Sequence, residues 1–228
     1  DLHYDRGRIG TIFGTGIGGL RTLEGQVEVR VAKGKERVSP FLVPMMMSNA
    51  SGAAISMRHG FRGPAETICT ACAAATHVFG YVVRQISWGM CDAVISGGSE
   101  SAATITAVAG FENMTALSTS MVSKPFDATR DGFIFGEGAA VFVLERLDLA
   151  IKRGVKILGE IVGAGSNADA HHITAPSPGG VGAAACMQLA LTDADLSPQD
   201  IKQVNAHGTS TPLNDAAEAQ AVSKIFGK

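Results

Sequence analysis

Residues 66–86 read ETICTACAAATHVFGYVVRQI, and this stretch decides the fold class of the chain. Glu66–Thr70 has the character of a strand, and Ala71-Cys72 then opens a long helix. Apolar residues in the helical part recur at the i, i+3, i+4 spacing of a helix buried along one face. They are Ala75, Val78, Phe79, Val82, Val83 and Ile86. The stretch predicts a buried strand that runs directly into an amphipathic helix.

The same alternation of strands and helices continues on both sides of this stretch. Strands are predicted over residues 9–13, 93–96, 139–144, 157–162 and 201–204, with Gly97-Gly98 closing the second of them. Helices are predicted over residues 53–58, 147–153, 183–191 and 215–226, together with one that ends near Leu117, and residues 24–37 read as a surface helix and loop. Such alternation predicts an α/β protein with a largely parallel sheet covered on both faces.

Composition excludes several classes of protein. Hydrophobic residues make up 46% of the 228 positions and charged residues 18%, which is unlike a disordered chain. A formal charge of −2 without a long basic run disfavours a nucleic-acid or anionic membrane surface. No apolar run approaches the ~18–20 residues of a membrane span. Four cysteines are too few for a disulfide framework, so we expect a cytoplasmic protein. The abrupt start and end predict an internal fragment.

Two motifs suggest cofactors that their context does not support. Residues 14–19, GTGIGG, match a dinucleotide fingerprint after a strand, but the charged segment that follows offers no convincing second strand with an acidic end. We therefore expect a structural glycine turn and no NAD. Cys69 and Cys72 form a C-x-x-C, but Cys91 and Cys186 stand alone, so a zinc site lacks its other half. A redox pair prefers an exposed turn, whereas residues 67–71 read as a buried strand that runs into a helix.

Cys72 considered alone is a candidate nucleophile. It lies at a strand-to-helix junction, where unpaired helix N–H groups favour a negative charge and can lower the pKa of a thiol from ~8.5. Its neighbours Ala71 and Ala73–Ala75 are small enough for a sharp bend and for the approach of a substrate. Position alone leaves open whether Cys72 is instead a small buried hydrophobe.

The segment Asn205–Thr211 favours the interpretation of Cys72 as a nucleophile. It follows a predicted strand and places His207 in a glycine loop, a position that suits a functional site. Glu218 follows eleven residues later on a predicted helix, as a possible partner for a cation.

Three blocks in this order resemble the β-ketoacyl-acyl-carrier-protein synthases, which are decarboxylating Claisen condensing enzymes. The blocks are Thr70–Ala74; Lys124–Asp127 with Asp131–Phe133 and Gly136–Ala139; and Asn205–Pro212 with Asp215. The resemblance covers nearly the whole chain. It implies a thiolase-like, layered α/β/α/β/α fold that is incomplete at both ends, with residues 1–155 in one half and residues 156–228 beginning the second. It also implies a homodimer.

The resemblance also implies a mechanism of fatty-acid elongation. Cys72 would take an acyl chain as a thioester, and malonyl-acyl-carrier protein would be decarboxylated to attack it. His207 matches a histidine that stabilises the enolate oxygen, and Glu218 matches a carboxylate paired with a lysine. Thr209 and Thr211 match hydroxyls that bind the pantetheine arm of the carrier protein. No metal or redox cofactor is implied, since the partner brings its own phosphopantetheine.

Departures and alternatives remain. The position of Cys69 is more often serine in this family, and that of Ala75 more often glycine. The block His171–Pro176 is similar to loops near the pantetheine tunnel, although it also reads as a solvated loop. A polyketide ketosynthase would carry the same three blocks. A non-catalytic chain-length-factor-like partner typically lacks the nucleophile, and a degradative thiolase or Cys-His thioesterase is disfavoured by Asn205–Pro212.

Overall fold

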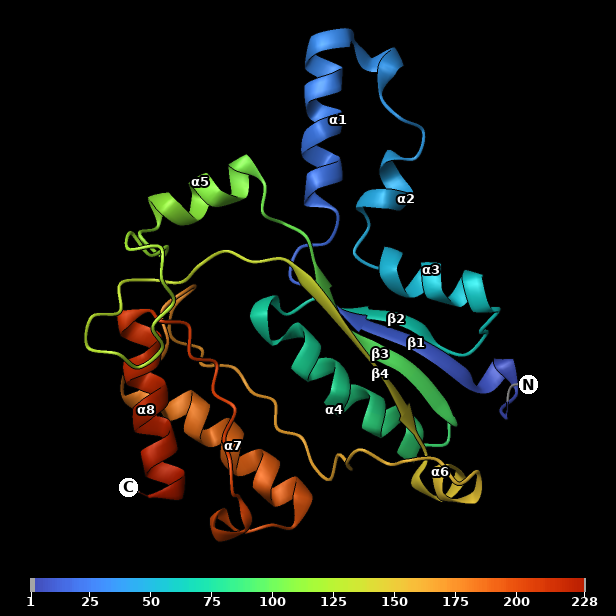
Figure 1. Cartoon of the computed structure of the whole chain (residues 1–228), viewed down its shortest axis with the longest axis vertical. Helices are drawn as coiled ribbons and strands as arrows, with labels where there is room; N and C mark the ends of the chain where they lie inside the picture. The colour runs from blue at the N-terminus through green and yellow to red at the C-terminus, as the bar shows by residue number, and fades with distance from the viewer. Residues whose placement is uncertain (1–2, 228) are drawn as a thin grey trace. The chain divides into compact units, whose positions relative to one another are not determined.

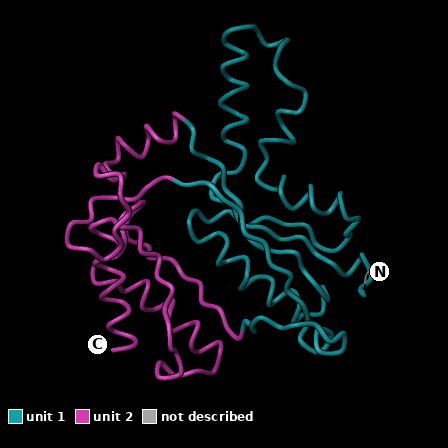
Figure 2. Tube along the Cα trace, viewed as in Figure 1, with its two compact units in different colours: residues 1–104, 136–161 teal, residues 105–135, 162–228 magenta. Residues whose placement is uncertain are grey.

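The computed structural model describes residues 3–227 of the chain (Figure 1). Asp1, Leu2 and Lys228, the ends at which the sequence predicts an incomplete chain, lie outside these residues. The chain forms two compact units, each built from two segments (Figure 2). Unit 1 comprises residues 1–104 and 136–161, and unit 2 comprises residues 105–135 and 162–228. These units are compact regions of the structure, whereas the predicted halves, residues 1–155 and 156–228, are expected to be related in fold. The division into units therefore does not test the predicted halves, which stay a prediction.

Unit 1 is built on a mixed four-stranded sheet. Its strands are β1 (Ile9–Gly14), β2 (Ala65–Ile68), β3 (Ala93–Glu100) and β4 (Gly138–Glu145), in the order β2-β1-β3-β4. β1 pairs in parallel with β2 and with β3, as predicted, whereas β4 pairs antiparallel with β3. β4 begins opposite the residue at which β3 ends, since Gly138 pairs with Glu100. The chain has not crossed back to the other end of the sheet, so β4 must run in the opposite direction.

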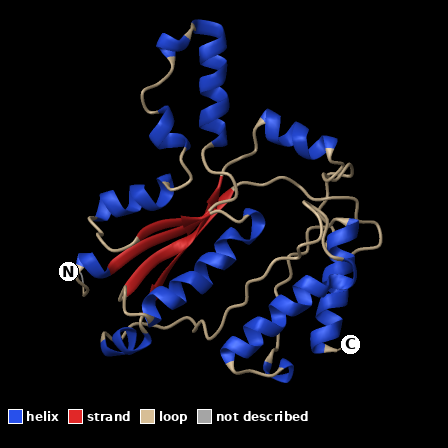
Figure 3. Ribbon diagram, turned by 180° about the vertical axis from the view of Figure 1, so that it is seen from behind, coloured by secondary structure: helices blue, strands red, loops and turns tan. Residues whose placement is uncertain are grey.

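Two helices cover opposite faces of this sheet, α3 (Ala50–His59) on one and α4 (Ala74–Ser87) on the other (Figures 1 and 3). Ile12 of β1 lies in a buried cluster with Val78 and Val82 of α4. The next residue, Phe13, points to the other face, where it lies against Gly52 of α3. The apolar stripe predicted for residues 75–86 therefore faces the core. Unit 1 also contains α1 (Leu20–Lys33), α2 (Leu42–Met46), α6 (Leu147–Lys152), η1 (Arg6–Arg8), η2 (Lys35–Arg37) and η3 (Ala71–Ala73).

One predicted boundary in unit 1 is wrong. Gly97-Gly98 does not close β3, because the strand continues to Glu100 with Gly97 opposite Val141 and Gly98 opposite Ala140. Glycine weakens a strand without forbidding it, and it permits another backbone to come close.

The regular elements in the described part of unit 2 are helices, joined by long loops and one isolated parallel bridge between Leu117 and Phe133. It contains α5 (Ile105–Asn113), α7 (Val181–Ala194), α8 (Pro212–Phe226), η4 (Pro178–Gly180) and η5 (Pro198–Asp200), and α7 packs against α8. The strands predicted over residues 157–162 and 201–204 are wrong, since neither segment pairs with another strand in the described part of the chain. A short apolar run has the composition of a strand, but it becomes one only by backbone pairing. None of the helices within residues 3–227 has both the length and the apolar character needed to cross a bilayer.

Candidate active site

Cys72 lies in the tight turn that joins β2 to α4. The turn is the short helix η3, and α4 begins at Ala74, two residues after Cys72 and later than the predicted start at Ala71-Cys72. The preceding residue, Ala71, has φ = 51°, a left-handed conformation that residues with a Cβ seldom adopt. Strain of this kind persists only where the surrounding structure holds it, and it is concentrated at functional sites. The turn presents the Cys72 side chain at the surface of the unit, at the carboxyl end of β2.

Small residues let the start of α4 come unusually close to the sheet. A Cβ added to Gly14, at the end of β1, would lie 2.6 Å from the carbonyl carbon of Ala74. A Cβ added to Gly98 in β3 would lie 2.8 Å from the Cβ of Ala75. Because both distances are far below van der Waals contact, this packing requires glycine at both positions and a small residue at 75.

The backbone N–H groups of the glycine turn after β1 are bonded within unit 1. The Glu100 carboxylate, at the end of β3, accepts the backbone N–H of Gly16 at 2.6 Å and that of Ile17 at 3.1 Å. Its oxygens also lie 3.3 Å from the hydroxyl of Thr15. In a dinucleotide site such N–H groups face a pyrophosphate. Here an internal carboxylate occupies them, a contact between residues 84 positions apart that the local motif cannot reveal.

The four cysteines differ in exposure. Cys69 and Cys72 are exposed and neither is in a disulfide, and the Sγ of Cys69 donates to the carbonyl oxygen of Gly16 at 3.2 Å. Burial raises the pKa of Cys91 and of Cys186 above the ordinary value, so these two thiols ionise less readily. Because a cysteine reacts as the thiolate, Cys69 and Cys72 are better candidates for a reactive thiol than the two less exposed cysteines. No cluster of three potential metal ligands occurs within the described residues.

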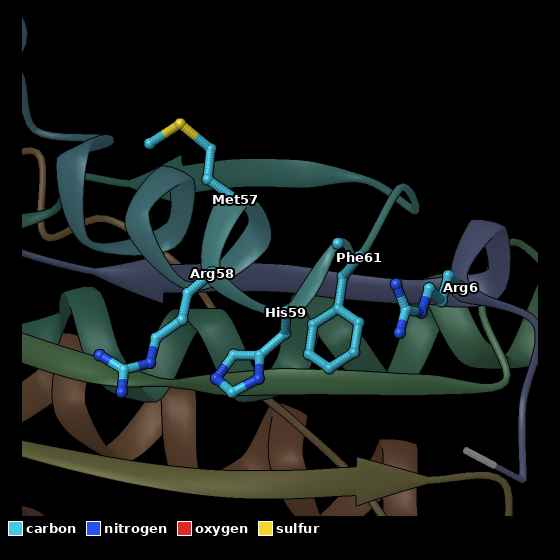
Figure 4. Close-up of a pocket in the computed structure, with 6 residues that line it drawn as sticks. Arg6, Met57, Arg58, His59 and Phe61 are labelled. Carbon is cyan, nitrogen blue, oxygen red and sulfur yellow. The ribbon is translucent and has the colours of Figure 1, made fainter. Parts of the chain in front are cut away.

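Two hollows mark the surface of unit 1. One, of about 540 Å³, lies beside the glycine turn and is lined partly by Thr15, Met45, Met47 and Glu100; Cys72 is not among its lining residues. The other, of about 420 Å³, is lined by Arg6, Met57, Arg58, His59, Gly60 and Phe61 (Figure 4). It lies at the amino ends of β1 and β2, whereas Cys72 follows the carboxyl end of β2. The second hollow is therefore not part of the Cys72 site.

His207 lies in unit 2, in the loop before α8. The Glu218 carboxylate on that helix accepts the backbone N–H of His207 at 2.6 Å and that of Gly208 at 2.8 Å. The side-chain amide of Asn214 also donates to Glu218 at 3.4 Å. The sequence resemblance matches Glu218 to a carboxylate paired with a lysine. Among the described residues Glu218 forms no salt bridge, and its oxygens fix the main chain that carries His207.

The two threonines of the same loop lie side by side. The hydroxyl oxygens of Thr209 and Thr211 are 2.8 Å apart, a hydrogen bond in which either can donate. Between them Ser210 is fully buried with φ = 66°, and its N–H donates to Asp215 at 3.2 Å. The two half-buried hydroxyls thus flank a strained, buried residue.

Buried Asp215 joins the second sequence block to the third within unit 2. Its Oδ2 accepts the backbone N–H of Phe126 at 2.8 Å and lies 3.6 Å from the Nε of Arg130. The backbone N–H of Lys124 donates to the Oγ of Ser210 at 2.9 Å. Sequence reasoning included Asp215 in a block but assigned it no role. The position of Asp215 in the first turn of a predicted helix indicates a capping role. Its contacts with Phe126 and Arg130, which are distant in the chain, cannot be predicted from the sequence.

Comparison with protein families agrees with the order of these blocks. Residues 2–150 match the model of the β-ketoacyl synthase N-terminal domain, and residues 158–228 match the model of the C-terminal domain. The chain belongs to the β-ketoacyl synthase family. The family that the three blocks indicated is therefore confirmed.

Individual relatives are similar over the whole chain. This chain is 44% identical over 224 residues to 3-oxoacyl-(acyl-carrier-protein) synthase 2 of Synechocystis sp. The alignment covers 96% of this chain and 54% of the relative. The crystal structure of a β-ketoacyl synthase from Burkholderia phymatum matches with a TM-score of 0.92 at 36% identity, over 100% of this chain and 56% of that one. This chain spans about half the length of the curated relatives it matches.

A third likeness is to a type II polyketide-synthase ketosynthase, solved with its acyl-carrier protein and bound to a hexaketide. Its TM-score is 0.94 at 28% identity, and the match covers 99% of this chain and 58% of that chain. The layered α/β arrangement of unit 1 and these likenesses confirm the thiolase-like fold class of the ketosynthases.

Proposed function

We propose that the protein is a β-ketoacyl-acyl-carrier-protein synthase, an acyltransferase that extends a Cys72-bound acyl chain by decarboxylative condensation with malonyl-acyl-carrier protein. The observation that carries the proposal is the strained turn that exposes Cys72 at the start of α4. Family membership, shown by residues 2–150 and 158–228, supports it.

The first half-reaction is acyl transfer to Cys72. The thiolate attacks the thioester carbonyl of the acyl-carrier protein, a new C–S bond forms, and the carrier's pantetheine thiolate leaves and takes up a proton. Helix N–H groups without intrahelical partners lie at the start of α4, and their partial positive charge favours the thiolate. The close seating of Ala74 and Ala75 on the sheet holds this helix end in place.

The second half-reaction uses His207. Loss of CO₂ from the malonyl thioester leaves negative charge on the thioester oxygen, and the resulting enolate carbon attacks the Cys72 thioester, whose thiol is then released. The imidazole N–H of His207 donates to the enolate oxygen. Preorganised donors are effective because they need no reorientation when charge develops. Glu218 supports this role, since its bonds to the N–H groups of His207 and Gly208 hold the loop.

The paired hydroxyls of Thr209 and Thr211 bind the pantetheine arm of the carrier protein. Each hydroxyl can donate and accept, so the pair can turn one donor toward the amide groups of the arm. The proposal needs no resident metal or cofactor, because the thioester makes the carbanion accessible and the phosphopantetheine belongs to the partner.

Fatty-acid elongation is favoured over polyketide assembly. The relative named 3-oxoacyl-(acyl-carrier-protein) synthase 2 is 44% identical to this chain, whereas the polyketide ketosynthase is 28% identical. A non-catalytic chain-length-factor-like partner is disfavoured because Cys72 and His207 are both present. A degradative thiolase or thioesterase is disfavoured by the Asn205–Pro212 block.

The assembly proposed is a cytoplasmic homodimer. Within the described residues, β2 and β4 each pair on one side only, so each end of the sheet offers backbone groups to a second chain. None of the four cysteines, all within the described residues, is in a disulfide, which suits a reducing compartment.

A split of the two half-reactions tests the proposal in the complete protein that carries this sequence. In His207→Ala, acyl loading of Cys72 should stay near normal, while malonyl decarboxylation and condensation fall by about 10²–10³, the typical cost of one lost oxyanion donor. Both steps are followed with radiolabelled acyl- and malonyl-carrier protein, and the exposed His59→Ala variant serves as the control. A variant that decarboxylates normally but cannot be loaded would refute this role for His207.

A further inference from the structure

A hydrogen bond crosses the Cys72 turn from one side to the other. The Oγ1 of Thr70 and the Nδ1 of His77 are 2.7 Å apart. Thr70 is the last residue before Ala71, the position with φ = 51°, and His77 lies in the first turn of α4. The bond therefore closes a loop that contains Ala71 and Cys72.

The geometry of the turn makes this contact consequential. A residue with a Cβ leaves the left-handed region when nothing holds it there, because the extended and right-handed regions are more favourable. If Ala71 relaxed, the direction in which Cys72 leaves the chain would change with it. A bond that ties Thr70 to α4 opposes that relaxation.

The strand side of the turn is held separately. Cys69 donates from its Sγ to the carbonyl of Gly16 at 3.2 Å, and the N–H of Gly16 is bonded to Glu100. The residues before Thr70 are therefore held by the contact of Cys69 with Gly16, and Thr70 itself is held by its hydrogen bond with His77 of α4. His77 supplies the helix-side support from a half-buried side chain.

We infer that His77 is a positioning residue, whose imidazole holds Thr70 and thereby keeps the Cys72 thiol at the start of α4. The inference rests on the proposed function of Cys72 as the nucleophile. It assigns the imidazole no contact with substrate and no proton transfer.

The test measures the reactivity of each cysteine in the purified protein. Iodoacetamide is the probe, and peptide mapping by mass spectrometry gives a rate constant for each of the four thiols. The variants are His77→Leu, Thr70→Val, their combination, and His77→Asn, whose amide can occupy the place of Nδ1. Thr76→Val is the matched control, since the Thr76 side chain on α4 is exposed and its hydroxyl makes no hydrogen bond within the described residues.

The loss of one ordinary hydrogen bond changes an equilibrium constant by a factor of roughly 2 to 12. The rate constant for alkylation of Cys72 should therefore fall about fivefold in His77→Leu and in Thr70→Val. The double variant should fall no further than either single one, because both remove the same bond. His77→Asn should recover most of the rate, and Thr76→Val should match the parent protein. Buried Cys91 reports on folding and should stay unmodified throughout.

An unchanged Cys72 rate in both single variants, or losses that add in the double variant, would overturn the inference. If His77→Leu exposes Cys91 by unfolding, Thr70→Val decides, and a normal Cys72 rate in that variant refutes the positioning role. Failure of the proposed function looks different, because Cys72 in the parent protein would then react no faster than Cys69.

Discussion

The carboxylate of Glu218 accepts the backbone N–H of His207 at 2.6 Å, although the two residues are eleven positions apart. A second oxygen of the same carboxylate accepts the N–H of Gly208. The orientation of the loop is therefore set from α8, through the main chain, and the imidazole itself is not consumed in that contact. This arrangement makes Glu218 a support for the proposed donor.

Replacing Glu218 by glutamine tests that support. The amide keeps the size of the side chain, but only one of its two polar atoms can accept an N–H, so one bond is lost and the other is weakened. Because bonds to charged groups contribute about 1.5–3 kcal/mol, we expect the free energy of unfolding to fall by about 2 kcal/mol in urea titrations. Glu112→Gln, at an exposed position on α5, is the control and should change little. A Glu218→Gln variant as stable as the control would show that the carboxylate does not hold the loop.

Gly14 beneath α4 and Gly110 inside α5 predict alanine substitutions with opposite effects on stability. Gly14→Ala places a Cβ 2.6 Å from the carbonyl carbon of Ala74, so the variant should lose about 1–3 kcal/mol of stability through overpacking. Gly110→Ala lies inside α5 with nothing within 4 Å of the new Cβ, and it should gain about 0.4–1 kcal/mol. Thermal unfolding of both variants checks the pair. Equal effects would contradict the close approach of α4 to β1.

Asp92 predicts a specific sensitivity to acid. Its carboxylate lies 2.9 Å from the Nη2 of Arg8 and 3.1 Å from the Nη1 of Arg146. The hydrogen bond from Arg8 is the main reason that the pKa of Asp92 lies below its ordinary value of 3.8. A carboxyl with a lowered pKa in the folded state stabilises the protein above the unfolded pKa, and this contribution is lost as pH falls through the folded pKa.

Urea unfolding of the parent protein and of Asp92→Asn, between about pH 7 and about pH 3, measures that contribution. The parent should be more stable near neutral pH, and the difference between the two proteins should shrink below about pH 4. A difference that does not change with pH would mean that Asp92 is not held by the two arginines.

Much of the site was predictable because local patterns encode it. The period of Ala75–Ile86 identified α4, and the small residues around Cys72 indicated a tight turn. What the sequence could not supply is long-range pairing. The bond from Gly16 to Glu100 links positions 84 apart, and the bond from Phe126 to Asp215 links positions 89 apart. Neither leaves a periodic signal.

The wrong predictions have the same origin. Residues 157–162 and 201–204 have the composition of strands, but composition does not specify a pairing partner. Two consecutive glycines, Gly97-Gly98, are typical of a strand end. Gly98 is instead required inside β3 because Ala75 of α4 packs closely against it, and such a tertiary contact cannot be read from the local sequence. The bond between Thr70 and His77 could not be predicted because it spans the turn between β2 and α4, where neither the helical nor the strand period holds.

If Cys72 carries the acyl chain, an acyl label trapped on the protein must map to that residue. The complete protein would be incubated with radiolabelled acyl-carrier protein in the absence of the malonyl substrate, then digested and mapped. We expect a thioester on Cys72, none on Cys69, Cys91 or Cys186, and no label in Cys72→Ser beyond a slow oxygen ester. A label found mainly on Cys69, or one that survives in a Cys72→Ala variant, would contradict this role of Cys72.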